Sequence, residues 1–172
     1  MNKFLIKSMK KISNTLGSNL DEFKDKTIMI TGANGLIGGF LSDFFMYLND
    51  EHNFNCKLVL TSLSDHPKRL GNSIYRKDVQ YHSRDLTQEA WFFDEIDFCI
   101  YCAGYAQPNK FLSDAEKTYQ LNVDSMVRAF QSVMFNRKKS KMLFISSSEV
   151  YALNDTTKPH CETDELKLDL WH

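Results

Sequence analysis

The sequence predicts an α/β protein with a doubly wound parallel sheet, on three observations. Short apolar runs of strand length alternate along the chain with longer segments of helical periodicity. The first such run, residues 27–31, breaks into a glycine-rich turn that leads directly into a helical pattern. The chain has 172 residues, which suits one well-buried domain and is too short for two of ordinary size. Alternation of strands and helices within one domain implies a parallel sheet.

The elements follow in order from these patterns. Residues 1–24 carry one apolar stripe at steps of three or four residues, which predicts an amphipathic helix. Docking on a domain or partner face is favoured, with binding to a membrane surface as the alternative. The stripe comprises Leu5, Met9, Ile12, Leu16, Leu20 and Phe23. Within residues 25–172 we expect strands at 27–31, 57–61, 79–82, 96–102 and 142–146, and helices at 36–49 and 113–135.

Composition limits the classes of function. A hydrophobic content of 42% and a formal net charge of −1 describe a globular chain without an electrostatic bias toward nucleic acid. No stretch approaches the ~20 apolar residues of a membrane span, and the N-terminus lacks the pattern of a signal peptide. We therefore expect a cytoplasmic protein with no nucleic-acid partner and no membrane span.

The four cysteines do not predict a metal or redox site. Cys99 and Cys102 have the spacing of a Cys-x-x-Cys pair, but residues three apart on a strand point to opposite faces. No second pair of Cys or His residues stands at ligand spacing. Packing in the core is therefore the favoured interpretation, and no metal is expected.

The turn after the first strand predicts a dinucleotide site. Gly32 can take the positive φ of a tight turn, Gly35 allows the backbone to approach a pyrophosphate, and Gly38 allows close packing of the helix. The free N–H groups at the start of this helix would then meet the phosphates. A helix start with incidental glycines is the alternative, and the buried strand before the turn and helical spacing after it favour the dinucleotide interpretation.

Four further segments share the order of a known family. They are Asp85-Leu86-Thr87, Tyr101-Cys102-Ala103-Gly104, Asn122-Val123 and Ile145-Ser146-Ser147-Ser148-Glu149-Val150-Tyr151. With the turn Thr31-Gly32-Ala33-Asn34-Gly35-Leu36-Ile37-Gly38, they resemble the extended short-chain dehydrogenase/reductase family, the NAD-dependent epimerases and dehydratases of nucleotide sugars. Ser125 and Ala152 stand where this family usually has glycine. The resemblance covers residues 27 to about 165 and implies a Rossmann fold.

The resemblance also implies which residues contact the cofactor, including Asp85 near the adenine. They are Gly32, Asn34, Gly35, Leu36, Ile37, Gly38, Asp85, Leu86, Cys102, Ala103, Gly104, Asn122, Ile145 and Ser146. Ligands of doubly wound sheets bind outside the carboxyl ends of the strands, so we expect these residues to converge there.

Two catalytic residues are implied in the same way. Ser147 resembles the family's hydroxyl residue that binds the sugar hydroxyl being oxidised, although it could instead satisfy backbone groups at a strand end. Glu149 resembles an acid beside the reacting sugar, and a structural hydrogen bond is an equal alternative.

The family's Tyr-x-x-x-Lys pair has no counterpart in this chain. Tyr105 precedes Lys110 by five residues, and Tyr151 is followed four residues later by Asp155. We therefore expect the N-terminal, cofactor-binding part of an enzyme, truncated before the Tyr-x-x-x-Lys segment and lacking the C-terminal substrate domain. Such a chain should be inactive by itself.

The residues leave the choice of cofactor open. Acids that select NAD usually stand at the end of the second strand, where this chain has Thr61, Ser62, Leu63 and Ser64. Lys68 and Arg69 could reach the 2′-phosphate of NADP. The resemblance favours NAD, because the family retains NAD through an internal cycle of oxidation and reduction.

The resemblance leads to the functional hypothesis. It implies an epimerase, dehydratase or decarboxylase that takes a nucleotide sugar through a transient 4-keto sugar, as in polysaccharide biosynthesis, and it allows a homodimer. The alternative is a non-catalytic dinucleotide-binding regulatory or scaffold protein. A Tyr-x-x-x-Lys pair encoded downstream would distinguish the enzyme from the regulatory or scaffold protein.

Overall fold

A five-stranded parallel sheet lies at the centre of the computed structural model, which describes residues 3–88, 95–105, 108–136, 139–147, 159 and 161–163. The strands are β1 (Thr27–Thr31), β2 (Lys57–Ser62), β3 (Val79–Ser83), β4 (Phe98–Tyr101) and β5 (Lys141–Phe144). Their order across the sheet is β3-β2-β1-β4-β5, with parallel pairing throughout. The doubly wound parallel sheet predicted from the sequence is confirmed, and β1 is its central strand.

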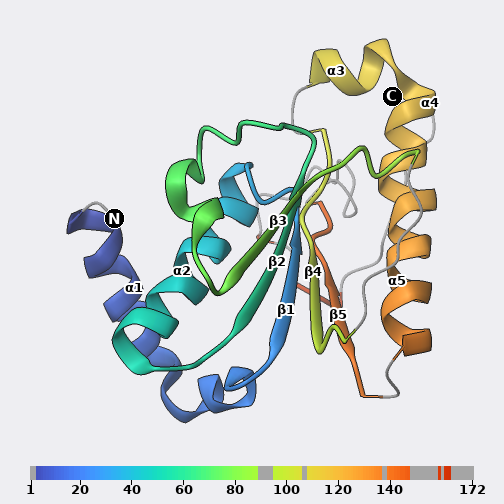
Figure 1. Ribbon diagram of the computed structural model, residues 1–172. Coiled ribbons are helices and arrows are strands. Elements are labelled where there is room, and N and C mark those ends of the chain that lie inside the picture. Colours follow the sequence, from blue (N-terminus) through green and yellow to red (C-terminus); the bar gives the residue numbers. More distant parts are fainter. Residues whose placement is uncertain are drawn as a thin grey trace.

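Helices cover both faces of this sheet (Figure 1). On one face lie α1 (Lys3–Leu16) and α2 (Leu36–His52), and on the other lies the helical run that ends in α5 (Ser125–Asn136). Shorter elements are the 3₁₀ helices Gly17–Phe23 and Gly71–Tyr75, and α3 (Pro108–Ser113) and α4 (Ala115–Tyr119). Within the part of the chain that the structure describes, none of the helices combines the length and apolar character needed to cross a bilayer.

The central strand is apolar on both faces because both faces are covered. Ile28 and Ile30 pack in the core beneath α1 and α2, whereas Met29 packs with Val59 and Cys99 beneath α5. A strand that is buried on both sides has no polar alternation, which explains its continuous apolar run. It therefore carries the glycine turn at a fixed place in the middle of the sheet.

The N-terminal segment contains a break that its apolar stripe does not reveal. The prediction of one helix over residues 1–24 is wrong, since α1 ends at Leu16 and Gly17 takes a φ of +52°. Glycine adopts this left-handed conformation without steric cost, so the chain turns into a 3₁₀ helix. Met9 and Leu20, on either side of the break, are both buried in the core beneath α1 and α2. Apart from Leu16, which is exposed, the stripe therefore packs in or against the core of this domain.

The helix predicted over residues 113–135 is also interrupted. Between α4 and α5, residues Gln120–Asp124 form a π-helical turn. In a regular α-helix the N–H of Ser125 would bond to the carbonyl of Leu121. Here the hydroxyl of Tyr101 on β4 donates to that carbonyl at 2.6 Å, and the Ser125 N–H donates to Gln120 instead. The contact with β4 therefore accounts for the extra residue in this turn.

Candidate functional site

The glycine turn follows β1 directly and is shaped by close backbone approach. Gly32 has a φ of +62°, as predicted, and a Cβ atom there would lie 2.8 Å from the carbonyl oxygen of Cys102. A Cβ on Gly38 would lie 2.5 Å from the carbonyl oxygen of Gly32, because α2 starts immediately above the turn. Real Cβ contacts are longer than either distance. Both positions therefore require glycine for this geometry.

The turn is tied to β4 as well as to β2. The hydroxyl of Thr31 accepts hydrogen bonds from the backbone N–H groups of Cys102 at 3.0 Å and Ala103 at 3.1 Å. On the other side, the N–H of Ala33 donates to the carbonyl of Thr61 at 2.9 Å. These bonds fix the ends of three adjacent strands relative to one another.

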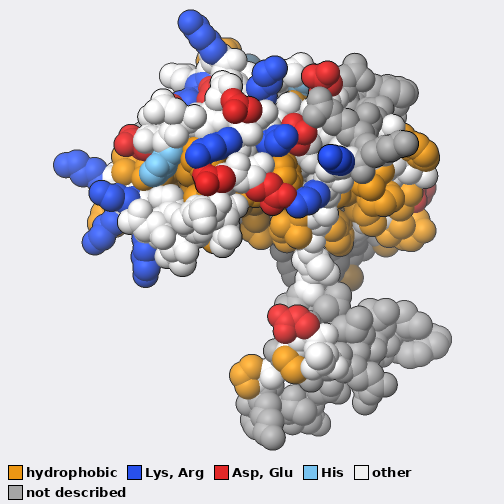
Figure 2. Space-filling view, turned by 90° about the horizontal axis from the view of Figure 1, so that it is seen from below, with side chains coloured by type: hydrophobic (Ala, Val, Ile, Leu, Met, Phe, Trp, Pro, Cys, Tyr) orange, Lys and Arg blue, Asp and Glu red, His pale blue; other side chains and the backbone are white. Residues whose placement is uncertain are grey.

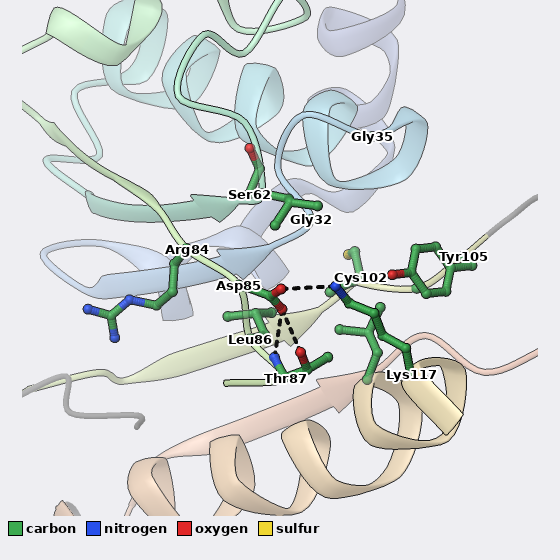
Figure 3. A pocket seen from close by; sticks show the side chains of 14 residues that line it. Gly32, Gly35, Ser62, Arg84, Asp85, Leu86, Thr87, Cys102, Tyr105 and Lys117 are labelled. Atoms are coloured by element: carbon green, nitrogen blue, oxygen red, sulfur yellow. Dashed lines mark hydrogen bonds and ion pairs between the residues drawn. The ribbon is translucent and has the colours of Figure 1, made fainter. Parts of the chain in front are cut away.

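A cavity of about 210 Å³ opens at this end of the sheet (Figure 3). It lies where β1 and β4 are neighbours, which is the point at which the strand order reverses. Ligands of doubly wound folds bind at such a switch point. The cavity is lined by Gly32, Gly35, Ser62, Leu63, Arg84, Asp85, Leu86, Thr87, Cys102, Ala103, Gly104, Tyr105, Lys117 and Leu121.

Half of the predicted cofactor residues line this cavity. They are Gly32, Gly35, Asp85, Leu86, Cys102, Ala103 and Gly104. Asn122 lies next to them, since its side-chain oxygen is 3.4 Å from the place of a Cβ on Gly104. The structure therefore brings together residues from the first turn, the end of β3, the end of β4 and the π-helical turn.

The other predicted residues lie outside the lining. Leu36 and Ile37 are exposed on the first turn of α2, and Gly38 is buried beneath it. Asn34 points to the loop after β2, because its side-chain oxygen accepts from the Arg69 N–H at 2.9 Å.

The residues after β5 are described only as far as Ser147. Ile145 continues the pairing of β5, since its N–H donates to the carbonyl of Tyr101 at 3.0 Å. Ser146 and Ser147 are exposed and do not line the cavity. Glu149 lies outside the described residues. The pairing of Ser147 with Glu149 therefore stays a prediction.

Asp85 holds the best-defined charge in the cavity. One carboxylate oxygen accepts from the Thr87 hydroxyl at 2.7 Å and the Thr87 N–H at 3.0 Å, and the other accepts from the Lys117 Nζ at 3.1 Å. Desolvation by itself would raise the pKa of Asp85, but the bonds from Thr87 and Lys117 outweigh it and lower that pKa. Asp85 is therefore a carboxylate at neutral pH.

The loop that carries Asp85 is anchored to the helical run opposite it. The Ser125 hydroxyl donates to the carbonyl of Leu86 at 2.6 Å. The Arg128 guanidinium donates to the carbonyls of Leu86 at 3.0 Å and Thr87 at 3.1 Å. Sequence reasoning did not identify Lys117 or Arg84 as lining residues, because neither belongs to a local motif.

The end of β2 offers no acid to the cavity. Ser62 and Leu63 line it there, and the Ser62 hydroxyl lies 2.6 Å from that of Tyr81. Arg69, one of the two cations that could reach a 2′-phosphate, instead pairs its guanidinium with Asp43 on α2. The carboxylate of Asp43 is one-tenth exposed, so this pair is directed into the protein.

These residues fit a dinucleotide. Gly35 is the N-cap of α2, is exposed and lines the cavity, so the positive end of the helix dipole lies beside the cavity at a residue without a side chain. Asp85 supplies an acceptor on the other side of the cavity, where an amine on a base could donate. A phosphate would therefore meet N–H groups and a base would meet a carboxylate.

Comparison with known proteins agrees with this geometry. A model described as the NAD dependent epimerase/dehydratase family matches residues 28–169. A search of curated protein sequences finds no match.

Among solved structures, a UDP-N-acetylglucosamine 4-epimerase from Methanobrevibacter ruminantium, in complex with UDP-N-acetylmuramic acid, is 23% identical with a TM-score of 0.69. The match covers 84% of this chain and 44% of that one. Pal from Bacillus thuringiensis is 18% identical with a TM-score of 0.63, over 82% of this chain and 45% of that one. The enzyme WbmF from Bordetella bronchiseptica, in complex with NAD⁺, is 14% identical with a TM-score of 0.59. The match covers 84% of this chain and 42% of that one.

These structures share the fold of this chain, which spans less than half the length of each. The family model matches most of the chain, from β1 onward, and includes the glycine turn and every described residue that lines the cavity. The chain therefore belongs to the NAD dependent epimerase/dehydratase family.

Proposed function

We propose that this chain is the NAD-binding part of an enzyme that modifies a nucleotide sugar through a transient 4-keto intermediate. Epimerisation, dehydration and decarboxylation all begin with oxidation of a sugar hydroxyl, so one cofactor site serves each of them. The solved relatives support this class, since one is a UDP-sugar epimerase and another holds NAD⁺. This chain spans less than half the length of these relatives, so the complete activity is part of the proposal.

The observation that carries the proposal is the placement of the glycine turn opposite Asp85 across one cavity. The exposed N–H groups at the start of α2 bind a pyrophosphate, and Gly35 leaves room for it. Asp85 accepts a hydrogen bond from the adenine, and residues 102–104 line the wall between them. The proposed cofactor residues are the seven predicted ones that line the cavity, together with Asn34, Leu36, Ile37, Gly38, Asn122, Ile145 and Ser146.

The cofactor, when bound, supplies a hydride acceptor beside the sugar. Ser147 then holds the sugar hydroxyl that loses its proton, and Glu149 serves as an acid or base next to the sugar ring. The proton itself is removed by a phenolate outside these 172 residues, so the chain alone binds cofactor without turnover. In a longer, active protein, Ser147→Ala should lower turnover by about 10²- to 10³-fold while cofactor affinity stays constant.

The binding step is tested by calorimetry with NAD⁺. Gly35→Val should abolish binding, because the branched side chain projects over the N–H groups that meet the pyrophosphate. Circular dichroism and a thermal melt confirm that the variant is folded. Equal affinity of wild type and folded variant would overturn the assignment of the turn.

A further inference from the structure

Lys117 reaches Asp85 from a different part of the chain. It lies on α4, whereas Asp85 follows β3, and the two line the same cavity (Figure 3). Their side chains are 32% and 23% exposed, and the nitrogen–oxygen distance is 3.1 Å. A partly exposed ion pair of this kind adds little to stability, typically about 0–1 kcal/mol.

The loop does not depend on Lys117 for its anchorage. Ser125 and Arg128 already bind the carbonyls of Leu86 and Thr87. What Lys117 adds is a bond to one particular carboxylate oxygen, Oδ2, while Thr87 makes both of its bonds to Oδ1. The pair therefore determines the direction of the carboxylate more than the position of the backbone.

The hydrogen bonds that Asp85 already accepts leave one acceptor direction of its carboxylate open to a ligand. Each carboxylate oxygen accepts about two hydrogen bonds. The two bonds from Thr87 fill Oδ1, whereas Oδ2 takes one from Lys117 and keeps one acceptor direction. A donor that enters the cavity can therefore bond to Asp85 through a single, fixed direction.

We infer that Lys117 is a positioning residue that aims Oδ2 of Asp85 at the exocyclic amine of the adenine base. The inference rests on the proposed dinucleotide function and assigns a role to a residue outside the motifs. With Lys117 removed, the carboxylate rotates away from the base and the hydrogen bond to the amine weakens. Contacts to the pyrophosphate at the glycine turn do not change.

Two ligands separate this role from a structural one. The first is NAD⁺, and the second is the analogue whose base is unsubstituted purine and therefore lacks the exocyclic amine. Calorimetry on the full chain should show that wild type binds NAD⁺ about tenfold more tightly than the purine analogue. Lys117→Met should lose most of this difference by weakening NAD⁺ binding, while the affinity for the analogue stays constant. Lys117→Arg should restore part of it, because arginine keeps the charged donor.

Lys24→Met is the matched control. It breaks the Lys24–Asp21 ion pair, whose nitrogen–oxygen distance is 2.8 Å, at a place that does not line the cavity. Affinity for both ligands should match wild type. Lys117→Gln provides a second variant in case Lys117→Met is unfolded by circular dichroism.

Each other outcome overturns the inference in a distinguishable way. If substitution of Lys117 lowered the affinity for both ligands equally, Lys117 would have a role in loop structure alone. Equal affinity of wild type for NAD⁺ and the purine analogue would show that Asp85 does not bind the amine, while the dinucleotide function stands. No binding of NAD⁺ by the wild-type chain would overturn the proposed function and the inference together.

Discussion

The hydroxyl of Thr31 is the acceptor for the backbone N–H of Cys102, 71 residues further along the chain, at 3.0 Å. It also accepts from Ala103 at 3.1 Å, so one fully buried side chain satisfies two donors at the end of β4. The geometry of the cavity wall therefore depends on a single oxygen atom of β1.

Thr31→Val should destabilise the chain. The substitution keeps the shape of the side chain but leaves two backbone donors without their acceptor, at a cost of about 1–3 kcal/mol for a buried group. Urea unfolding followed by circular dichroism measures the loss. Thr31→Ser, which keeps the hydroxyl, should lose less, and equal stability of Thr31→Val and wild type would contradict the argument.

Gly38→Ala should also lower stability, for a steric reason. The new methyl group would sit 2.5 Å from the carbonyl oxygen of Gly32, so α2 or the turn must shift, at a cost of about 1–3 kcal/mol. Gly104→Ala is the matched control, because its methyl group would meet the Asn122 side chain at an ordinary 3.4 Å. If both variants unfolded at the same urea concentration, the close approach at Gly38 would not be the cause.

The stability of the chain should fall in acid partly through Asp78. Desolvation opposes ionisation of Asp78, but hydrogen bonds from Arg76 and Asn49 outweigh it and lower its pKa below the ordinary value of 3.8. A lowered pKa in the folded state contributes stability above the ordinary pKa, and this contribution is lost as the pH falls through the folded value. Asp78→Asn should therefore reduce the difference in unfolding free energy between pH 7 and pH 2. An unchanged difference would show that other carboxylates account for the whole acid transition.

Cofactor preference tests the pairing of Arg69 with Asp43. We expect NAD to be preferred, because the Arg69 guanidinium is held by Asp43 rather than directed at the cavity. Asp43→Asn should release Arg69 and raise the affinity for NADP relative to NAD, and adding Arg69→Gln should cancel that gain. A wild-type preference for NADP of more than tenfold, about 1.4 kcal/mol, would overturn the expectation.

Self-association is expected through the outer face of α5. Val127, Phe130, Met134 and Phe135 are 38–84% exposed there, and Figure 2 shows hydrophobic side chains gathered on this side of the molecule. Exposed apolar groups in one patch favour contact with another protein surface. Phe130→Lys should shift sedimentation toward the monomer, whereas Tyr75→Lys, at an exposed aromatic residue on another element, should not. A wild-type chain that is monomeric at all concentrations would contradict this.

The local patterns of the sequence predict the sheet well and the contacts across it poorly. All five strands were predicted within two residues of their observed ends. The buried strands β1, β2 and β4 produce nearly continuous apolar runs, whereas β3 and β5 are partly exposed at the edges of the sheet. The break at Gly17 and the π-helical turn were missed because their causes are not periodic. The π-helical turn follows from the Tyr101 hydroxyl, which contacts Leu121 from another element. Lys117 was missed for the same reason, since its partner lies 32 residues away.

The central place of β1 also sets an order for assembly. Thr27 pairs with Lys57 on β2 after the single crossover through α2, whereas β4 must return from beyond β3 to pair on the other side. Closing a longer loop costs more chain entropy, so the β1-α2-β2 half can assemble before β4 arrives. The glycine turn is then formed early, while the cavity wall at residues 102–104 is added by the later crossover from β3 to β4. Nucleotide affinity would thus arise only after β4 has paired with β1, and a ligand that binds there would stabilise this pairing as well as the first half of the sheet.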